Sequence, residues 1–416
     1  MVSNNIFSKP KAYIVSFLKW TLFGLLVGAL GGLLGAAFHH ALHFVTHLRS
    51  ENNWLLFLLP AGGLISVGIY LLFKQRSNRG TNQIIDAVLK GEEVSPLVAP
   101  TIFLATATTH LFGGSAGREG AALQIGGSIA SLLAKVLKLE RRDRRVLILS
   151  GMSAVFAGLF GTPLTATLFC MEFVSVGMVF SPALLPGFLA AYTASRVSGA
   201  LGVHAEGLLL ETVTAVTFSN SWRFVVLAVL VSLVGLFMCW LFHKAEHLAQ
   251  HHIPNAWLRI VLGGIVILGL TLLVGDHRYN GAGMEMALGA VEGNANWYDF
   301  ILKMLFTAIT LAAGFKGGEI VPTFCVGATF GCLAGGLLGL DPAICGALGL
   351  IGLFCCATNS PFASIMLSIE MFGGANIHLF ALVCVICFFL TNRSGLYSSQ
   401  MNIFGNSTPQ TQSRSS

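Results

Sequence analysis

An arginine and a glutamate stand next to each other inside a glycine-rich stretch that is otherwise apolar. The stretch is GGSAGREGA (residues 113–121), and the charged pair is Arg118 and Glu119. The glycines free the backbone to turn, and residues 121–133 predict a helix. A loop that opens a helix directs several unpaired N–H groups at one point, which the helix dipole makes attractive to anions. We expect the Glu119 carboxylate to occupy that anion site until it is protonated or displaced, as the gate of an anion pathway would.

Helix packing and phosphate binding are the alternatives to a gate for this stretch. Small residues let membrane helices pack closely, which would account for Gly113 and Gly126 without any binding site. A phosphate-binding loop would need the pattern GxxxxGK[ST] after a soluble strand, and the stretch has neither feature. Because ionisable side chains within membrane segments are costly, the Arg118–Glu119 pair favours a functional site.

The composition around this site is that of a polytopic membrane protein. Of the 416 residues, 55% are hydrophobic and only 10% are charged, whereas a soluble protein carries about 25% charged residues. Uncharged runs such as residues 146–171 and 342–369 are long enough to span a bilayer. Several runs contain glycine and proline, which predicts short, tilted or discontinuous helices buried against protein. An all-α membrane fold is therefore expected.

The basic residues indicate topology and not a nucleic-acid partner. The net charge is +6, and the densest basic cluster is KVLKLERRDRR (residues 135–145). Under the positive-inside rule this loop faces the cytoplasm, as does the earlier basic set that includes Lys19 and Lys74. The first residues, MVSNNIFSKPKAY, lack the features of a cleavable signal, so the first apolar segment is expected to remain.

The second half of the chain repeats motifs of the first half in the same order. GGSAGREG (residues 113–120) corresponds to AGFKGGEI (residues 313–320), which aligns Glu119 with Glu319. Further along, residues 151–172 correspond to residues 349–370, and each of these segments ends in a glutamate. Two related halves place discontinuous helices and the substrate site near the bilayer midplane. These residues leave open whether the repeat is parallel or inverted.

The alignment of the halves predicts that Glu119 and Glu319 approach the same region. Two carboxylates that share a dry site cannot both ionise easily, so one of them is expected to hold a proton at moderate pH. The pathway is then a candidate for carrying protons as well as anions.

These motifs resemble those of the ClC anion channels and anion/proton exchangers. GREGAALQIGG (residues 117–127) is similar to the GREGP…QIGG signature of that family, and GGEIVP (residues 317–322) resembles its GxFxP element. LYSS (residues 396–399) lies where the family keeps a pore tyrosine. The resemblance covers nearly the whole chain, and it implies a ClC fold of two inverted repeats and a homodimer with one pore in each subunit.

The resemblance also implies roles for individual residues. Glu119 would be the gate, because its carboxylate mimics the permeant anion and competes with it. Backbone N–H groups would bind the anion at an outer site, and the Tyr397 hydroxyl would contribute to a central one. The residues expected to supply those N–H groups are Gly117, Arg118, Gly120, Ile320 and Val321.

Three departures from the chloride-transporting members resemble the fluoride/proton antiporter branch. The motif GSGIP is replaced by NRGTN (residues 78–82), and GTNQII (residues 80–85) is similar to the GNNLII of that branch, which places Gly80 and Thr81 at the anion. Phe173 stands where exchangers keep an internal proton-accepting glutamate. Glu319 puts a carboxylate into the second anion motif, and GGEIVP is similar to GGEVTP of that branch, with Val321 in place of its threonine.

The expected function is proton-coupled fluoride export across a bacterial plasma membrane, and a chloride channel or chloride/proton exchanger is the alternative. Glu319 is assigned to the proton path. Glu172 is a second candidate for that path, although its match to Glu370 favours a structural role for both. Glu319 could instead pair with Lys316, and Arg79 is more simply a solvated loop residue than an anion funnel.

Histidines recur at helical spacing in both halves. One set is His39, His43 and His47, the other is His243, His247 and His251, and His40 and His252 lie beside them. Such rows could bind a metal or sense pH, but polar faces at the membrane interface explain them more simply, and no metal or cofactor is expected. An enzyme is not expected either, because no nucleophile–base pair accompanies Glu119.

These patterns divide the chain into four segments. They are a cytoplasmic N-terminal helix (1–20), a first membrane repeat (21–210), a second membrane repeat (211–401) and a disordered polar tail (402–416). The tail is too short for the nucleotide-binding regulatory domain that many ClC proteins append. The expected partners are therefore halide ions, protons, lipid and a second copy of the chain.

Overall fold

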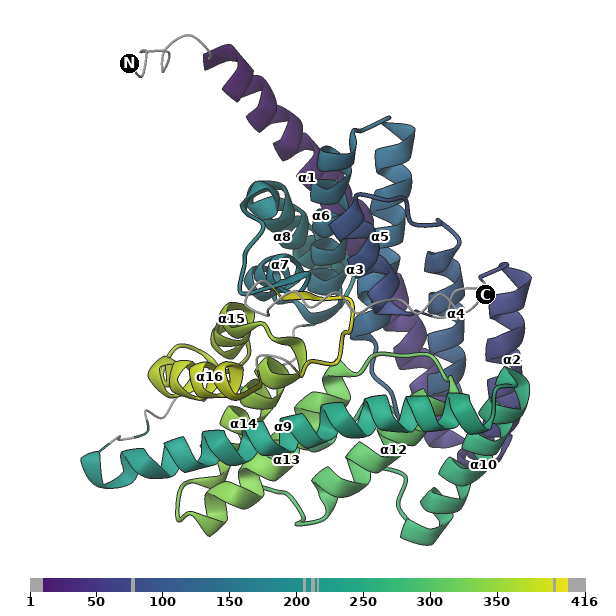
Figure 1. Ribbon diagram of the computed structural model, residues 1–416, viewed down its shortest axis with the longest axis vertical. Coiled ribbons are helices and arrows are strands. Elements are labelled where there is room, and N and C mark those ends of the chain that lie inside the picture. The colour runs from purple at the N-terminus through teal and green to yellow at the C-terminus, as the bar shows by residue number, and fades with distance from the viewer. Residues whose placement is uncertain are drawn as a thin grey trace, which may run out of the picture.

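The computed structural model describes residues 10–75, 79–204, 207–210, 214, 217–391 and 394–402, and these residues are mostly helical (Figure 1). The elements of the first half are α1 (Pro10–Glu51), η1 (Asn53–Leu58), α2 (Leu59–Leu72), α3 (Thr81–Lys90), α4 (Val98–Leu111), α5 (Glu119–Val136), α6 (Arg141–Phe160), α7 (Pro163–Glu172), β1 (Ser175–Val176), η2 (Ser181–Ala183) and α8 (Leu184–Ala200). Those of the second half are α9 (Phe218–His252), α10 (Ala256–Val274), α11 (Met284–Val291), α12 (Asp299–Ala313), α13 (Ile320–Leu337), α14 (Pro342–Thr358), α15 (Pro361–Phe372), α16 (Ile377–Thr391) and β2 (Met401–Asn402).

Five helical segments of the described residues are long and apolar enough to cross a membrane. They are Tyr13–Glu51, Asn53–Leu72, Ser219–His252, Ala256–Val274 and Ile320–Leu337. In the most apolar 18-residue stretch of Ile320–Leu337, 78% of the stretch is buried inside the protein. In that of Ala256–Val274, only 22% is buried. Protein therefore surrounds α13, which carries a candidate site at its first turn, whereas α10 lies at the periphery where lipid can cover it.

The N-terminal helix is not a separate surface element. Residues 10–20, which the sequence analysis assigns to a cytoplasmic N-terminal helix, are the first turns of α1, which runs unbroken from Pro10 to Glu51; residues 1–9 lie outside the described part of the chain. No proline interrupts this helix after its first residue, and its glycines let it approach α8 closely. A Cβ on Gly28 would lie 2.7 Å from the Ala190 carbonyl oxygen. Close packing thus holds the middle turns of α1 against α8, whereas residues 13–18 are exposed.

The long uncharged runs of both halves break at equivalent places. Residues 146–171 divide between α6 and α7, and residues 342–369 divide between α14 and α15. Each break is a residue in the left-handed conformation followed two positions later by proline: Gly161 (φ 72°) before Pro163, and Asn359 (φ 54°) before Pro361. The proline starts the new helix, where its missing N–H costs nothing.

The two halves are related by a two-fold rotation, as reciprocal contacts show. The Gly117 N–H donates to the Gly318 carbonyl oxygen (2.7 Å), and the Gly318 N–H donates to that of Gly117 (2.8 Å). A two-fold axis between the halves makes each contact in both directions, as this antiparallel pair of hydrogen bonds does. The helices that follow these glycines, α5 and α13, leave their meeting point in different directions (Figure 1). The repeats are therefore inverted.

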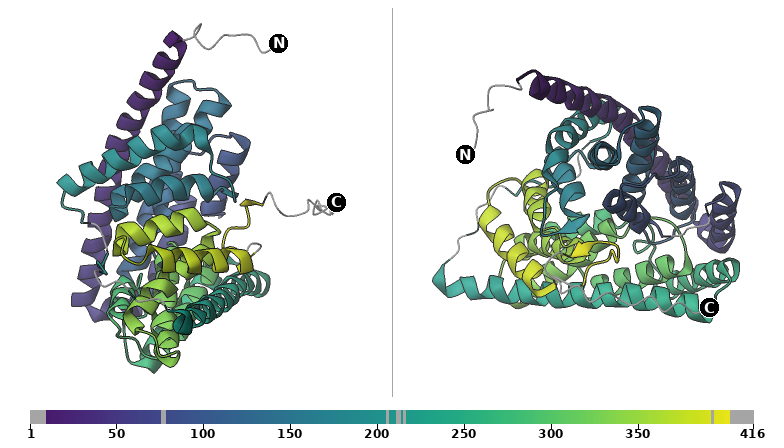
Figure 2. Two further views of the ribbon diagram at one scale, coloured as in Figure 1. Left: turned by 90° about the vertical axis from the view of Figure 1, so that its left-hand side faces the viewer. Right: turned by 45° about the horizontal axis from the view of Figure 1, so that its top comes forward.

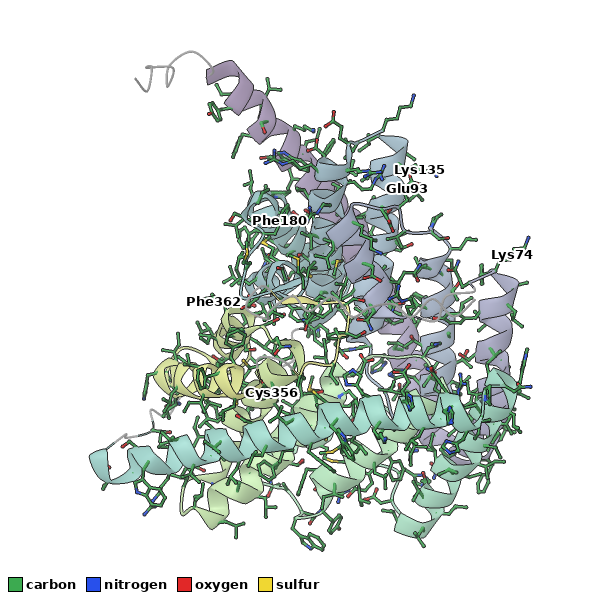
Figure 3. The ribbon with its side chains drawn as sticks, viewed as in Figure 1. Lys74, Glu93, Lys135, Phe180, Cys356 and Phe362 are labelled. Atoms are coloured by element: carbon green, nitrogen blue, oxygen red, sulfur yellow. The ribbon has the colours of Figure 1, made fainter. Side chains whose placement is uncertain are left out.

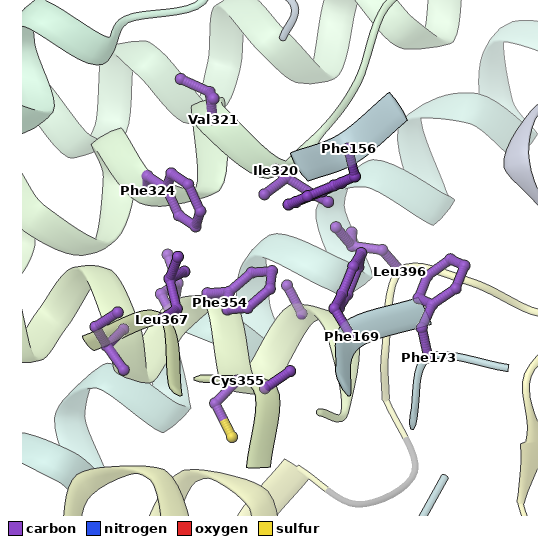
Figure 4. Packing of buried hydrophobic residues seen from close by; sticks show 14 of the residues in the cluster. Phe156, Phe169, Phe173, Ile320, Val321, Phe324, Phe354, Cys355, Leu367 and Leu396 are labelled. Atoms are coloured by element: carbon purple, nitrogen blue, oxygen red, sulfur yellow. The ribbon is translucent and has the colours of Figure 1, made fainter. Parts of the chain in front are cut away.

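The core unites the halves beneath this meeting point. Aromatic rings from both halves pack in sequence, from Phe156 to Phe169 (centroids 5.3 Å apart), Phe354 (5.4 Å) and Phe324 (5.4 Å) (Figure 4). Each such aromatic pair stabilises the fold by about 0.5–1.5 kcal/mol more than the burial of its surface area alone does. Phe324 lies in the second turn of α13, so this packing fixes the position of the helix start above it. Along one side of the molecule, α9 packs against α12, α13, α14 and α16 (Figure 2).

The basic cluster forms one face of the protein. Lys135 Nζ lies 2.8 Å from Glu93 Oε2 (Figure 3), and Lys19 Nζ lies 2.6 Å from Asp143 Oδ2. The hydrogen bond from Lys135 holds the pKa of the Glu93 carboxyl below its usual value, so this carboxylate remains charged. The start of α1, the end of α5 and the start of α6 share this face, which the positive-inside rule assigns to the cytoplasm.

Candidate functional site

The Glu119 carboxylate lies where the two halves meet. Glu119 is the first residue of α5 and is fully buried. Its Oε2 accepts hydrogen bonds from the backbone N–H of Arg118 (3.1 Å) and from that of Val321 (3.2 Å), at the start of α13. A carboxylate therefore sits among amides of both helix starts, in the position that a small anion would take.

The second oxygen of this carboxylate is buried without a partner. Glu119 Oε1 has no hydrogen bond to any described residue. A buried, charged oxygen without a donor costs on the order of 1–3 kcal/mol, and more for a full charge. Glu119 is thus held less firmly than a structural carboxylate would be, which suits a side chain that takes up a proton or yields its place.

Glycines are required here because backbone and side chains approach closely. A Cβ on Gly318 would lie 2.8 Å from the Gly120 nitrogen and 2.9 Å from the Glu119 nitrogen, and one on Gly117 would collide with Glu119 Oε2. These two glycines therefore allow the loops before α5 and α13 to meet around the Glu119 side chain. In contrast, a Cβ on Gly126 would meet the backbone of α6 at Gly151, so that glycine serves the packing of membrane helices.

A second carboxylate lies beside the first. Glu319 precedes α13, and its Oε2 lies 3.5 Å from the Tyr397 hydroxyl, which donates to it. The charges of Glu119 and Glu319 act on each other. Lys316, the alternative partner for Glu319, places its Nζ over the ring of Tyr70, 4.8 Å from the centroid. The structure thus brings Glu119, Glu319 and Tyr397 together, as the sequence predicts.

The start of α3 completes the site. Gly80 adopts φ 53° immediately before Thr81, and Thr81 is buried. The Thr81 hydroxyl oxygen lies 3.0 Å from where a Cβ on Gly120 would be, so it lies against the backbone at the start of α5. Three helix starts, those of α3, α5 and α13, therefore surround one small region, together with Tyr397 from the C-terminal segment.

The segment that carries Tyr397 is held by residues that the sequence motifs did not identify. Asn82 Oδ1 accepts the Ser399 N–H (3.1 Å), and Gln400 Nε2 donates to the carbonyl oxygens of Phe173 and Thr358 (2.8 Å each). β2 then pairs in parallel with β1. The sequence offered little indication that these residues hold the Tyr397 segment, because Asn82 and Gln400 are single amide side chains in short motifs.

A buried lysine behind the loop was also missed. Lys303 is fully buried on α12, and its Nζ donates to the Ser115 hydroxyl (2.9 Å) and to the Gly281 carbonyl oxygen (2.7 Å). Ser115 lies two residues before Gly117, so the lysine fixes the loop and places positive charge behind it. A lone lysine within the apolar run of α12 was the signal that could have identified it.

Arg118 contributes its backbone more than its side chain. While its N–H binds Glu119, its Nη1 lies 3.2 Å from His39 Nδ1 and its guanidinium lies over the Phe160 ring, 5.4 Å from the centroid. Arg79, in turn, is a largely exposed residue paired with Asp86 (2.8 Å). That pairing agrees with a solvated loop residue.

The histidine rows stack along their helices. The rings of His39 and His43 are 6.4 Å apart, and those of His247 and His251 are 6.1 Å apart. Within the described ranges, no three His, Cys, Asp or Glu side chains converge as a metal site would require. All nine cysteines are free and buried.

Glu172 lies at a different contact between the halves. Its carboxylate accepts the N–H groups of Phe362 (3.3 Å) and Ala363 (2.9 Å) at the start of α15. Glu370 does the same for Leu164 and Thr165 at the start of α7 (2.9 and 2.8 Å). These reciprocal caps mark a second point on the two-fold axis. They support the structural role of Glu172 over a role in a proton path.

Replacing Glu172 by alanine is expected to lower stability without changing the transport stoichiometry. The change leaves the two N–H groups at the start of α15 without an acceptor, which costs about 1–3 kcal/mol. Glu172→Gln retains one acceptor oxygen, so it should lose less stability than Glu172→Ala. Thermal unfolding of the purified protein measures the first effect and vesicle transport the second. Loss of proton coupling in Glu172→Gln at unchanged stability would return Glu172 to the proton path.

Comparison with known proteins agrees with this geometry. The family model described as "Voltage gated chloride channel" matches residues 62–393. The chain belongs to the ClC family. It is 34% identical over 390 residues to a chloride/fluoride channel protein of Pseudomonas syringae pv. tomato, a match that covers 92% of this chain and 86% of that protein.

Solved ClC structures match over nearly the same length. A CLC-type fluoride/proton antiporter has 32% identity and a TM-score of 0.89, over 92% of this chain and 98% of that one. A slow cyanobacterial Cl−/H+ antiporter has 20% identity and a TM-score of 0.77, over 90% and 94%, and shows the fold alone. The expected ClC fold of inverted repeats is confirmed. ClC proteins are membrane transporters and channels for halides, and the family is not one of enzymes.

Proposed function

We propose that this ClC protein exports fluoride from a bacterial cell in exchange for protons that enter. The observation that carries the proposal is the convergence of two carboxylates on one set of amides. Glu119 accepts the Val321 N–H, and Glu319 stands one residue before the helix that provides this amide. A gate that only opens and closes needs one carboxylate, whereas coupled proton transfer needs a place to put a proton when the anion holds the site.

The donors of the site suit a small, strongly hydrated anion. Backbone N–H groups of Val321 and Arg118, with the hydroxyl groups of Thr81 and Tyr397, can replace water around a halide, and an anion held by dipoles is able to leave again. The names of the relatives, a chloride/fluoride channel protein and a CLC-type fluoride/proton antiporter, support fluoride. Fluoride enters cells as neutral HF, and an inward proton gradient can drive its export.

Glu119 acts as the gate in this proposal. When it is ionised it occupies the anion position, and when it is protonated it loses the charge that competes with fluoride. Glu319 exchanges protons with Glu119 and with the region of the site next to the Tyr397 hydroxyl. The proposed assembly is a homodimer in the plasma membrane, with a complete pore in each subunit, since each chain supplies all three helix starts.

The experiment that tests the function follows fluoride and protons together. Proteoliposomes loaded with fluoride should release it while they take up protons in a fixed ratio. Chloride loaded in the same way should leave at least about tenfold more slowly, which corresponds to about 1.4 kcal/mol of discrimination. Rapid chloride flux that ignores a pH gradient would instead support a chloride channel, and chloride flux coupled to protons would support a chloride/proton exchanger.

A further inference from the structure

An aromatic side chain, that of Phe173, lies beside Tyr397 in the core. Phe173 is fully buried, and its ring packs edge-on against the Tyr397 ring (centroids 4.6 Å apart) and against Phe169 (4.9 Å). An apolar ring neither binds nor passes a proton. Protons that reach Glu319 from inside the cell therefore need another path to the Tyr397 side of the site.

A hollow lined by both polar and apolar residues lies on that side. It has a volume of about 670 Å³, and we call it the inner vestibule; its walls include Tyr397, Ser398, Asn359, His243, Lys244 and His247. A space of this size, with several polar groups in its walls, has room for water. The vestibule thus lies against Tyr397, whose hydroxyl is 3.5 Å from Glu319 Oε2, and against two histidines on α9.

The vestibule lies at the cytoplasmic end of α9. The start of α9 is tied to the end of α13 by a hydrogen bond from Arg223 Nη1 to the Gly339 carbonyl oxygen (3.2 Å). Because the halves are inverted, α13 ends on the face opposite to the basic cytoplasmic face at which α5 ends. α9 therefore begins outside and ends inside, so His243 and His247 face the cytoplasm.

The hydrogen bond of His243 fixes which of its nitrogens can take a proton. His243 Nε2 lies 3.2 Å from the Leu396 carbonyl oxygen, next to Tyr397. A carbonyl only accepts, so Nε2 carries the hydrogen and the neutral ring presents the Nδ1 lone pair as its base. His243 is therefore positioned beside the tyrosine in a defined tautomer.

The other ionisable groups around the vestibule are few. Cys239 and Lys244 line it from α9. Glu246, one turn after Phe242 on the same helix, acts electrostatically on both Lys316 and Glu319. The two histidines bring imidazole rings to the vestibule, and an imidazole can both accept and donate a proton.

We propose that His243 and His247 collect cytoplasmic protons and deliver them through the inner vestibule and Tyr397 to Glu319. The imidazolium releases its Nδ1 proton to vestibule water, and that water protonates the Tyr397 oxygen as the tyrosine O–H proton passes to Glu319 Oε2. Tyrosine and water each gain one proton and lose one, so the net change is a neutral histidine and a protonated Glu319. The proposal rests on the proposed proton-coupled function and names its inner proton route.

The test replaces both histidines by alanine and then adds free imidazole to the solution. Vesicles loaded with potassium fluoride, with valinomycin to clamp the voltage, report the initial rate of fluoride efflux. His243→Ala with His247→Ala should slow coupled efflux about 100-fold, at the low end of what proton-transfer groups contribute. Added imidazole should restore most of the rate, because the vestibule is open to it. An unchanged rate, or a loss that imidazole leaves in place, overturns the proposal.

Two controls separate proton delivery from damage to the fold. His47→Ala with His252→Ala removes two exposed histidines outside the vestibule and should leave the rate unchanged. In a Glu119→Gln background, where fluoride flux needs no proton, loss of His243 and His247 should have no effect, and slowing there would overturn the proposal. If the unmodified protein shows no proton-coupled fluoride transport, the proposed function fails; if it does and the double variant matches it, only the histidine route fails.

Discussion

Vesicles that carry the Glu119→Gln variant should release fluoride without taking up protons. Glutamine has the size of glutamate, and its amide oxygen can still accept the N–H groups of Arg118 and Val321 that bind Glu119 Oε2. It carries neither a charge that competes with fluoride nor a proton that can be given up. We expect the ratio of protons to fluoride to fall at least about tenfold, to background, because the exchangeable carboxylate is a general acid–base group with effects of that size or larger.

The matched control for this variant is Glu93→Gln. Glu93 is a carboxylate on the cytoplasmic face, paired with Lys135 at 2.8 Å and distant from the three helix starts of the site. The same chemical change there should leave the ratio of protons to fluoride as it is in the unmodified protein. A Glu119→Gln protein that still exchanges protons for fluoride in a fixed ratio would show that Glu119 is not the coupling gate.

The site was predictable from the sequence because its chemistry is local. A glycine-rich loop that opens a helix determines where its N–H groups point, whatever surrounds it. The repeated motif then placed Glu319 opposite Glu119, and the structure joins these two loops through Gly117 and Gly318. Tyr397 was assigned from the resemblance of LYSS (residues 396–399) to the ClC segment that carries the pore tyrosine, and its hydroxyl does contact Glu319.

Long-range features of the fold were not predictable in the same way. Nothing in the composition of residues 1–20 separates a surface helix from the first turns of α1, because only packing against α8 shows that the helix continues. The reciprocal caps of Glu172 and Glu370 depend on helix starts about 190 and 206 positions away in the chain. Asn82 and Gln400 likewise act on segments that only the folded chain brings near.

Inversion of the repeats explains why similar motifs have different roles in the site. A two-fold axis gives each half the same loop, but the helix starts then approach the anion from two sides. Glu119 binds amides of both halves, whereas Glu319 contacts Tyr397, which has no counterpart in the first motif. The proposed function uses this difference: Glu119 is the proposed gate and Glu319 the proposed proton-transfer group.

Glu319→Gln should therefore stop coupled transport and not merely uncouple it. With Glu319 neutral and unable to pass a proton on, Glu119 remains ionised in the anion position and the site stays blocked. We expect fluoride efflux to fall about 100-fold, the lower range for loss of a group that transfers protons. The two variants thus differ in kind, since Glu119→Gln keeps its flux and loses its coupling. Simultaneous fluoride-electrode and pH recordings on the same vesicles distinguish them.

A double-mutant cycle with Tyr397→Phe tests whether Glu319 and the tyrosine act as one relay. The phenylalanine keeps the ring that packs on Phe173 and removes only the hydroxyl, 3.5 Å from Glu319 Oε2. When two residues act in series, replacing both slows transport little more than replacing one of them does. The double variant should therefore transport fluoride at nearly the rate of Glu319→Gln alone. Additive losses would place the tyrosine on the anion side only. Transport by Glu319→Gln at the unmodified rate and ratio would show that the second carboxylate has no part in moving protons, and a proton pathway would then have to reach Glu119 directly.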